Sequence, residues 1–129
     1  MADGVAGPVA DSILGLLLNA AVFAGYPALF AQLHLGEPGA DGTANPALNT
    51  TRAAAGSFAR SSAGAWANAT AIVWTNVPAG ETYSHVSLWS ATSAGTFVAS
   101  GAVTSPAVTP GEGFQVAAGA LIVSMPVAA

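Results

Sequence analysis

The sequence contains no cysteine, so it has no disulfide, no thiolate metal ligand and no thiol nucleophile. It also contains no lysine, and its only fixed cations are Arg52 and Arg60. Nucleic-acid recognition needs several basic side chains on one face to contact phosphates. Two arginines cannot provide such a face, so we expect no nucleic-acid partner.

Charged residues of either sign are scarce, at 6% of the 129 residues, against about 25% in ordinary soluble domains. Hydrophobic residues make up 53%, and the formal net charge is -4. A free monomer with so few charges dissolves poorly, and exposed apolar patches mark contact surfaces. We therefore expect neighbouring molecules to cover part of the surface.

Few side chains offer catalytic chemistry, and neither a Gly-x-Ser-x-Gly motif nor a phosphate-binding glycine loop is present. Glu81 and His85 lie four residues apart, and His34 lies three before Glu37. Either pair could orient a catalytic base, but a plain hydrogen bond is the simpler interpretation. Two histidines and a carboxylate could bind zinc or iron, although no ligand spacing suggests it. We predict a non-enzymatic protein with no cofactor and no metal.

The longest uncharged run, from Ile13 to Phe30, is 18 residues and lies near the lower limit for a membrane span. Asn19 lies inside it, Gly25 and Pro27 interrupt it, and no basic residue flanks it. A signal peptide needs a positively charged first region. These features argue against a membrane or export role.

The same run predicts a helix from about Ile13 to Ala24, capped by Asp11 or Ser12 and ended by Gly25. Residues 1–10, rich in Gly, Ala and Pro, are typical of a flexible arm. A helix that is apolar on most sides is buried on most sides. We expect it to pack on the sheet of its own domain; contact with a neighbouring subunit is the further possibility. The candidate packing or interface residues are Leu14, Leu17, Leu18, Val22 and Phe23.

After Pro27 the hydrophobic pattern alternates, which predicts a strand over residues 28–35. From Thr50 onward, turn formers separate short segments typical of strands, near residues 51–60, 65–75, 82–90, 96–104, 112–117 and 120–125. This pattern predicts a mainly β chain, an antiparallel β-sandwich or jelly-roll-like domain with one N-terminal α-helix. The expected organisation is one compact domain, with the arm and helix over 1–26 and the β-sandwich over 27–129.

Three tryptophans, Trp66, Trp74 and Trp89, are the largest side chains of the chain. Aromatic residues bury the most area and dominate interfaces, so we interpret these as core or interface anchors. The alternative is that they line a sugar-binding groove.

Four short motifs follow one another along the chain: Leu33-His34, Glu37-Pro38-Gly39, the SHVSLW segment over 84–89 and the AAGAL segment over 117–121. Their order resembles that in a family of small tailed-phage virion proteins. The resemblance covers about Leu29 to Ser124, although Leu35, Ser90 and the Thr50-Thr51-Arg52 segment depart from the usual pattern. Members are common in phages of actinobacteria and are described as tail-fibre, minor tail, head-decoration or minor capsid proteins. The resemblance implies a non-enzymatic, virion-bound β-sandwich.

The chain lacks the heptad or collagen-like repeats that suit a long fibre stalk. One compact module suits a clamp over capsid-subunit junctions, where several weak contacts add up. We therefore expect a capsid decoration protein on the virion surface that binds the major capsid protein and forms a homotrimer. The alternative is a tail-fibre or minor tail protein that binds tail proteins and takes part in host adsorption through cell-wall sugar. A small cell-wall hydrolase is a third, weaker possibility.

Overall fold

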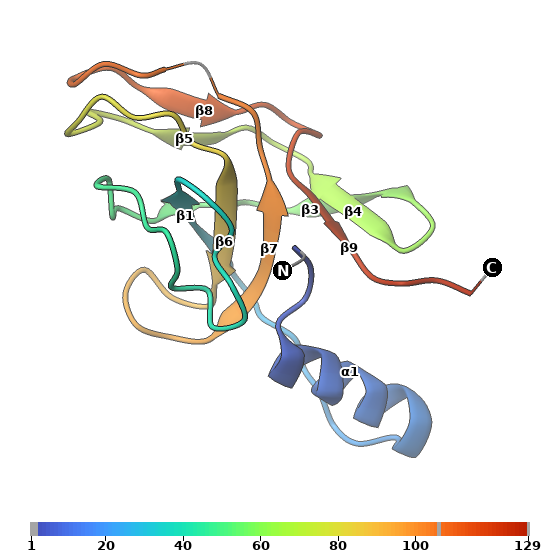
Figure 1. The fold of residues 1–129 in the computed structure, drawn as a ribbon. Coiled ribbons are helices and arrows are strands. Elements are labelled where there is room, and N and C mark those ends of the chain that lie inside the picture. Colours follow the sequence, from blue (N-terminus) through green and yellow to red (C-terminus); the bar gives the residue numbers. More distant parts are fainter. Residues whose placement is uncertain (1–2, 106, 129) are drawn as a thin grey trace.

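A computed structural model describes residues 3–105 and 107–128 (Figure 1). Within these residues, one helix precedes nine short strands, and all the strand pairs are antiparallel. The elements are α1 (Gly7–Asn19), β1 (Phe30–His34), β2 (Ala53–Ala54), β3 (Phe58–Ser62), β4 (Ala65–Asn68), β5 (Ile72–Trp74), β6 (His85–Trp89), β7 (Phe97–Ala102), β8 (Phe114–Val116) and β9 (Ile122–Ser124). The predicted mainly β fold with one N-terminal helix is confirmed.

The strands form three sheets with the orders β2-β1-β6-β7, β3-β4-β9 and β5-β8. The sheets meet where β7 lies beside β9 (Figure 1), and β2 contacts β5. Their inward side chains share one hydrophobic core, which includes Leu33, Ile72, Trp74, Leu88 and Leu121. The two-residue periodicity read from the sequence therefore identifies the core face of β1, where Ala31 and Leu33 are both fully buried.

Two of the expected strands are each divided in the structure. Gly56 has a φ of +68°, a left-handed conformation that interrupts the segment expected over 51–60. The segment expected over 65–75 breaks after Asn68, whose side-chain amide donates to the carbonyls of Thr70 and Ala117 at 2.9 and 3.0 Å. Its Oδ1 accepts from the N–H of Leu121 at 2.9 Å. The buried Asn68 side chain thus replaces strand-to-strand hydrogen bonds at this point. The hydrophobic periodicity of the sequence does not indicate such a break.

The N-terminal arm is held against β7, so the prediction of a flexible arm over 1–10 is wrong for residues 3–10; residues 1–2 lie outside the described range. The N–H of Ser100 donates to the carbonyl of Gly4, and that of Ala6 to the carbonyl of Val98, both at 2.8 Å. β7 is an edge strand, and the arm satisfies backbone groups that an edge leaves open.

The helix begins at Gly7 and ends at Asn19, earlier at both ends than the sequence suggested. Pro8 lies in the first turn, where its missing N–H costs nothing. Neither Asp11 nor Ser12 caps it. Ala20, in the left-handed region, ends the helix, and the N–H of Ala21 closes it on the carbonyl of Gly15 at 3.1 Å. In the described part of the chain, no helix combines the length and apolar character needed to cross a bilayer.

Candidate functional site: an uncovered apolar helix and its groove

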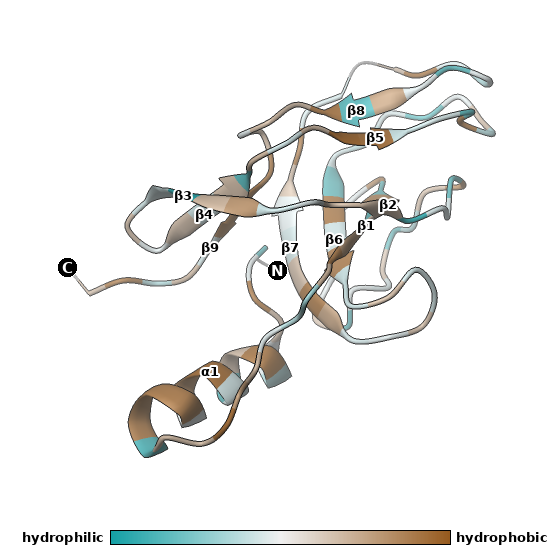
Figure 2. Cartoon of the chain, turned by 180° about the vertical axis from the view of Figure 1, so that it is seen from behind, coloured by the Kyte–Doolittle hydropathy of each residue, from teal (hydrophilic) through white to brown (hydrophobic). Residues whose placement is uncertain are grey.

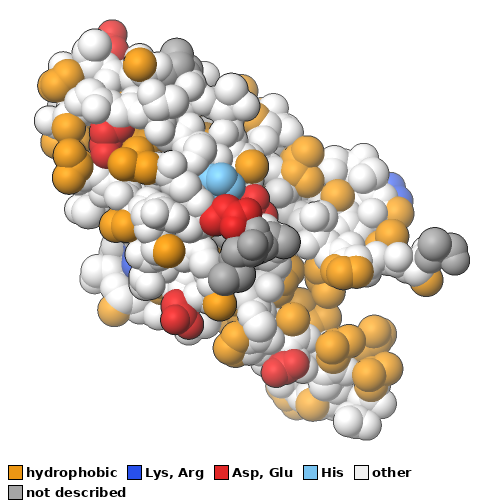
Figure 3. Space-filling view, in the orientation of Figure 1, with side chains coloured by type: hydrophobic (Ala, Val, Ile, Leu, Met, Phe, Trp, Pro, Cys, Tyr) orange, Lys and Arg blue, Asp and Glu red, His pale blue; other side chains and the backbone are white. Residues whose placement is uncertain are grey.

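The helix carries large apolar side chains that the rest of the chain does not cover. Leu17 is 73% exposed, and Val22, just beyond the helix, is 97% exposed. We call this set the helix surface: Leu14, Leu16, Leu17, Leu18 and Val22. Figure 2 shows α1 as a strongly hydrophobic element, and Figure 3 shows hydrophobic side chains gathered on it. The expectation that the helix packs on most sides against its own sheet is wrong.

The physical reason is the way α1 is attached. Of the described helical residues, Val9 alone is buried, in the first turn next to the arm. From there the helix projects from the β-domain (Figure 1), and the chain returns to β1 through residues 20–29. On the returning segment, Phe23 is half-buried and contacts Tyr26 edge to face, with ring centroids 6.1 Å apart. The later turns of α1 therefore stand free of the core.

A groove of about 270 Å³ lies where the helix, the returning segment and the β-domain meet. Its walls are apolar and come from the helix, the returning segment and strands of the β-domain; they include Val9, Ile13, Phe23, Leu29, Trp66 and Val98. Trp66 is 51% exposed at this groove. The helix surface and the groove together form an uncharged site suited to apolar contacts, since Asp11 is the only charged residue of α1.

The other two tryptophans are buried and belong to different sheets. Trp74 stacks on Phe114 with centroids 5.8 Å apart, and its Nε1–H donates to the carbonyl of Thr51 at 3.0 Å. Trp89 lies beneath the Arg52 guanidinium, 4.2 Å from the ring centroid. Because only Trp66 is exposed, the three rings do not line one sugar-binding groove. Trp74 and Trp89 pack in the interior, and Trp66 remains an interface candidate.

His34 is fully buried and does not pair with Glu37. Its Nδ1 lies 2.8 Å from the carbonyl of Ala44, which can only accept, so this nitrogen carries the proton. Nε2 then accepts from the Ser87 hydroxyl at 2.7 Å, and Ser87 Oγ accepts from the Trp89 Nε1–H at 2.7 Å. Burial lowers the pKa of His34, which agrees with a neutral ring in this closed network.

Glu81 is buried and is bonded elsewhere than to His85. Its carboxylate accepts from the backbone N–H groups of Leu48 and Asn49 at 2.7 and 3.3 Å, and from the Tyr83 hydroxyl at 3.4 Å. Burial, and secondarily the charge of Glu81, raise the pKa of Tyr83. Glu81 thus anchors the long loop after β1, a structural role.

His85 instead lies near Asp3 and Glu37, a grouping that sequence reasoning missed. Asp3 belongs to the arm, and nothing in the spacing of the three residues indicates that they meet. Ser84, His85 and Asp3 have the side chains of a hydrolytic triad, but the Asp3 oxygen lies 3.5 Å from Nε2. That separation is longer than the distance of about 2.6–3.2 Å that is usual in such a triad.

An antiparallel β-domain with an uncovered apolar helix is typical of a protein that assembles with others. The model of the family described as Podophage GP4 fiber I protein gp80 matches residues 6–124, and the chain belongs to this family. It is therefore a phage virion structural protein, as the sequence motifs suggested. No curated protein matches the chain. The fibre description favours the tail-fibre alternative over capsid decoration, while the actinobacterial origin stays a prediction.

Proposed function

We propose that this chain is a non-enzymatic subunit of a phage tail fibre that associates with copies of itself and with tail proteins through the helix surface and its groove. The observation that carries the proposal is the uncovered apolar helix in a member of a fibre family. Burying such apolar surface against a partner favours association by roughly 25 cal/mol for each Å² removed from water.

The arrangement of the chain supports assembly by the helix. The core of the β-domain is filled by its own side chains, while the leucines of α1 are exposed. The formal net charge of -4 is small, so charge repulsion between copies is weak. A homotrimer is the assembly that we expect. Host adsorption is a property of the assembled fibre, and this chain contributes the helix-mediated contacts that hold the subunits together.

Light scattering coupled to size-exclusion chromatography tests self-association through the helix surface. The wild-type chain should elute as an oligomer, and Leu17→Gln should shift it toward the monomer because it removes apolar area from the helix surface. Leu48→Gln is the matched control, because Leu48 is 70% exposed but lies in the loop after β1. A monomeric wild type, or equal effects of the two substitutions, would contradict self-association through α1.

Immunogold electron microscopy of purified virions tests the location. Labelling should follow the tail, and virions carrying Leu17→Gln should lose it. Labelling spread over the head would instead support the capsid decoration that the sequence suggested.

A further inference from the structure

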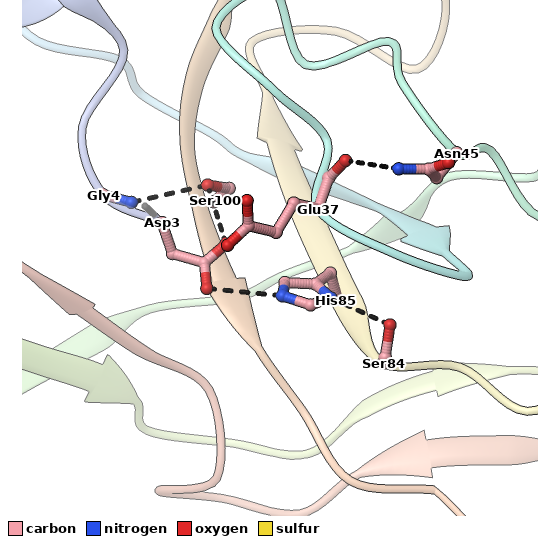
Figure 4. Close-up of polar contacts among 7 residues, drawn as sticks. All are labelled: Asp3, Gly4, Glu37, Asn45, Ser84, His85 and Ser100. Carbon is pink, nitrogen blue, oxygen red and sulfur yellow. Dashed lines mark hydrogen bonds and ion pairs between the residues drawn. The ribbon is translucent and has the colours of Figure 1, made fainter. Parts of the chain in front are cut away.

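Three side chains with metal-ligating groups meet where the arm crosses the β-domain (Figure 4). Asp3 comes from the arm, Glu37 from the loop after β1, and His85 from the start of β6. One potential ligand atom from each lies within 4.8 Å of the others, and all three residues are half-buried. Segments far apart in the sequence thus bring one imidazole nitrogen and two carboxylates to one place.

Neighbouring groups orient two of these side chains. Nδ1 of His85 lies 2.8 Å from Ser84 Oγ, and Nε2 faces Asp3 Oδ2 at 3.5 Å. The other Asp3 oxygen, Oδ1, accepts from the Ser100 hydroxyl at 3.3 Å. Histidines that bind metals have their second ring nitrogen held in this way, which fixes the direction of the ligating nitrogen.

The charges of the cluster also favour a cation. Two carboxylates stand together here, while Arg52 is engaged by Trp89 and by the carbonyls of Ala91 and Ala94. Arg60 lies on β3, and Figure 3 shows one histidine side chain beside acidic ones, with the visible basic side chains away from them. A divalent ion bound here would offset the charge of the two carboxylates.

We propose that Asp3, Glu37 and His85 bind a divalent transition-metal ion, with zinc as the preferred ion. Mixed imidazole and carboxylate ligands suit zinc and its neighbours, whereas calcium and magnesium favour sites made of oxygen alone. Metal–ligand bonds of about 2.0–2.2 Å require the donors to close in by roughly an ångström.

The ion would fasten the arm to the loop and to β6 at once. The arm leads directly into α1, so the bound metal would fix the direction in which the helix leaves the β-domain. This proposal rests on the cluster and not on the proposed function, and each can fail separately.

The chain has few other side chains that would bind zinc and obscure the measurement. It has no cysteine, and its other histidine, His34, is buried with both ring nitrogens in hydrogen bonds. The full chain should be prepared with a C-terminal tag that contains no histidine, because an N-terminal tag would disturb the arm. Isothermal titration with zinc chloride should then give one ion per chain, and cobalt(II) should give a visible absorption spectrum of a bound ion.

Each of Asp3→Asn, Glu37→Gln and His85→Gln should weaken zinc binding at least 10-fold and remove the zinc-dependent rise in Tm. Asp41→Asn, an exposed acid of the same loop as Glu37, is the matched control and should bind as the wild type does. Circular dichroism without metal checks that the variants remain folded. Absence of binding at millimolar zinc, or unchanged affinity in all three variants, would overturn the site. Equal affinity for magnesium would overturn the preference for zinc.

Discussion

At the scale of single residues, the fold depends on buried polar groups such as His34, both of whose ring nitrogens have partners. The His34–Ser87–Trp89 network links β1 to β6, and the only assignment of protons that satisfies it leaves the imidazole neutral. An unsatisfied buried polar group costs about 1–3 kcal/mol, so a network of this kind is stabilising only while every member keeps its role. Protonation of His34 would break that arrangement.

The stability of the chain should therefore depend on pH through His34. Burial places its folded-state pKa below the ordinary value of 6.5, so the unfolded chain binds this proton more readily. Stability is fully present above pH 6.5 and should fall as the pH drops from there toward the folded-state pKa. One proton limits the slope to about 1.4 kcal/mol per pH unit.

Urea unfolding between pH 5 and 7.5 measures this dependence. His34→Gln should flatten the profile, because it removes the buried histidine. A wild-type stability that stays constant over this range would contradict a neutral His34 ring in the folded chain.

At the scale of elements, the sequence predicts secondary structure well where packing is regular and poorly where a single contact decides. Alternation located the buried side of β1, and turn residues separated most strands. The division of the 65–75 segment depends on the Asn68 side chain reaching residues 117 and 121, which no local pattern encodes. The grouping of Asp3, Glu37 and His85 was hidden for the same reason, because the arm had to be placed first.

The helix shows this limit most clearly. Its hydrophobic character follows from the sequence, but its exposure does not. If the helix were buried on most sides, as the sequence predicts, Leu17→Asp would bury an unpaired charge and destabilise the chain. The structure reverses this expectation, because Leu17 is 73% exposed while Val9 in the same helix is 4% exposed. Hydrophobicity alone cannot distinguish a helix that packs inside a chain from one that awaits another chain.

Two substitutions in α1 separate these cases. Thermal unfolding of dilute protein should show Leu17→Asp within about 0.5 kcal/mol of the wild type, as for a surface change. Val9→Asp should cost about 3–5 kcal/mol, the usual effect of a buried charge without a partner. A large loss for Leu17→Asp in a monomeric sample would mean that the helix folds back onto the β-domain in solution.

At the scale of the whole molecule, the β-domain and α1 differ in how they treat apolar side chains. The β-domain buries its large side chains, while α1 carries most of its leucines outside. An oligomer joined through α1 is held by apolar contacts with few ion pairs, because the chain has only two arginines and no lysine. Its cohesion should therefore respond to agents that compete for apolar surface and hardly at all to salt.

A mild non-ionic detergent should accordingly separate the proposed oligomer into monomers, whereas 1 M sodium chloride should not. Light scattering follows the mass, and circular dichroism verifies that the β-structure persists. Dissociation by salt alone would show that charged groups, and not α1, join the copies.

The pairing of the arm with β7 also bears on how copies of this chain avoid joining wrongly. The arm occupies the outer side of β7, and the opposite margin of that sheet, β2, is only two residues long. Neither margin offers a long row of free peptide groups to another molecule. At this sheet, a polypeptide with too little charge to repel its own kind is thus protected from backbone pairing with another copy, and contacts there depend on side chains.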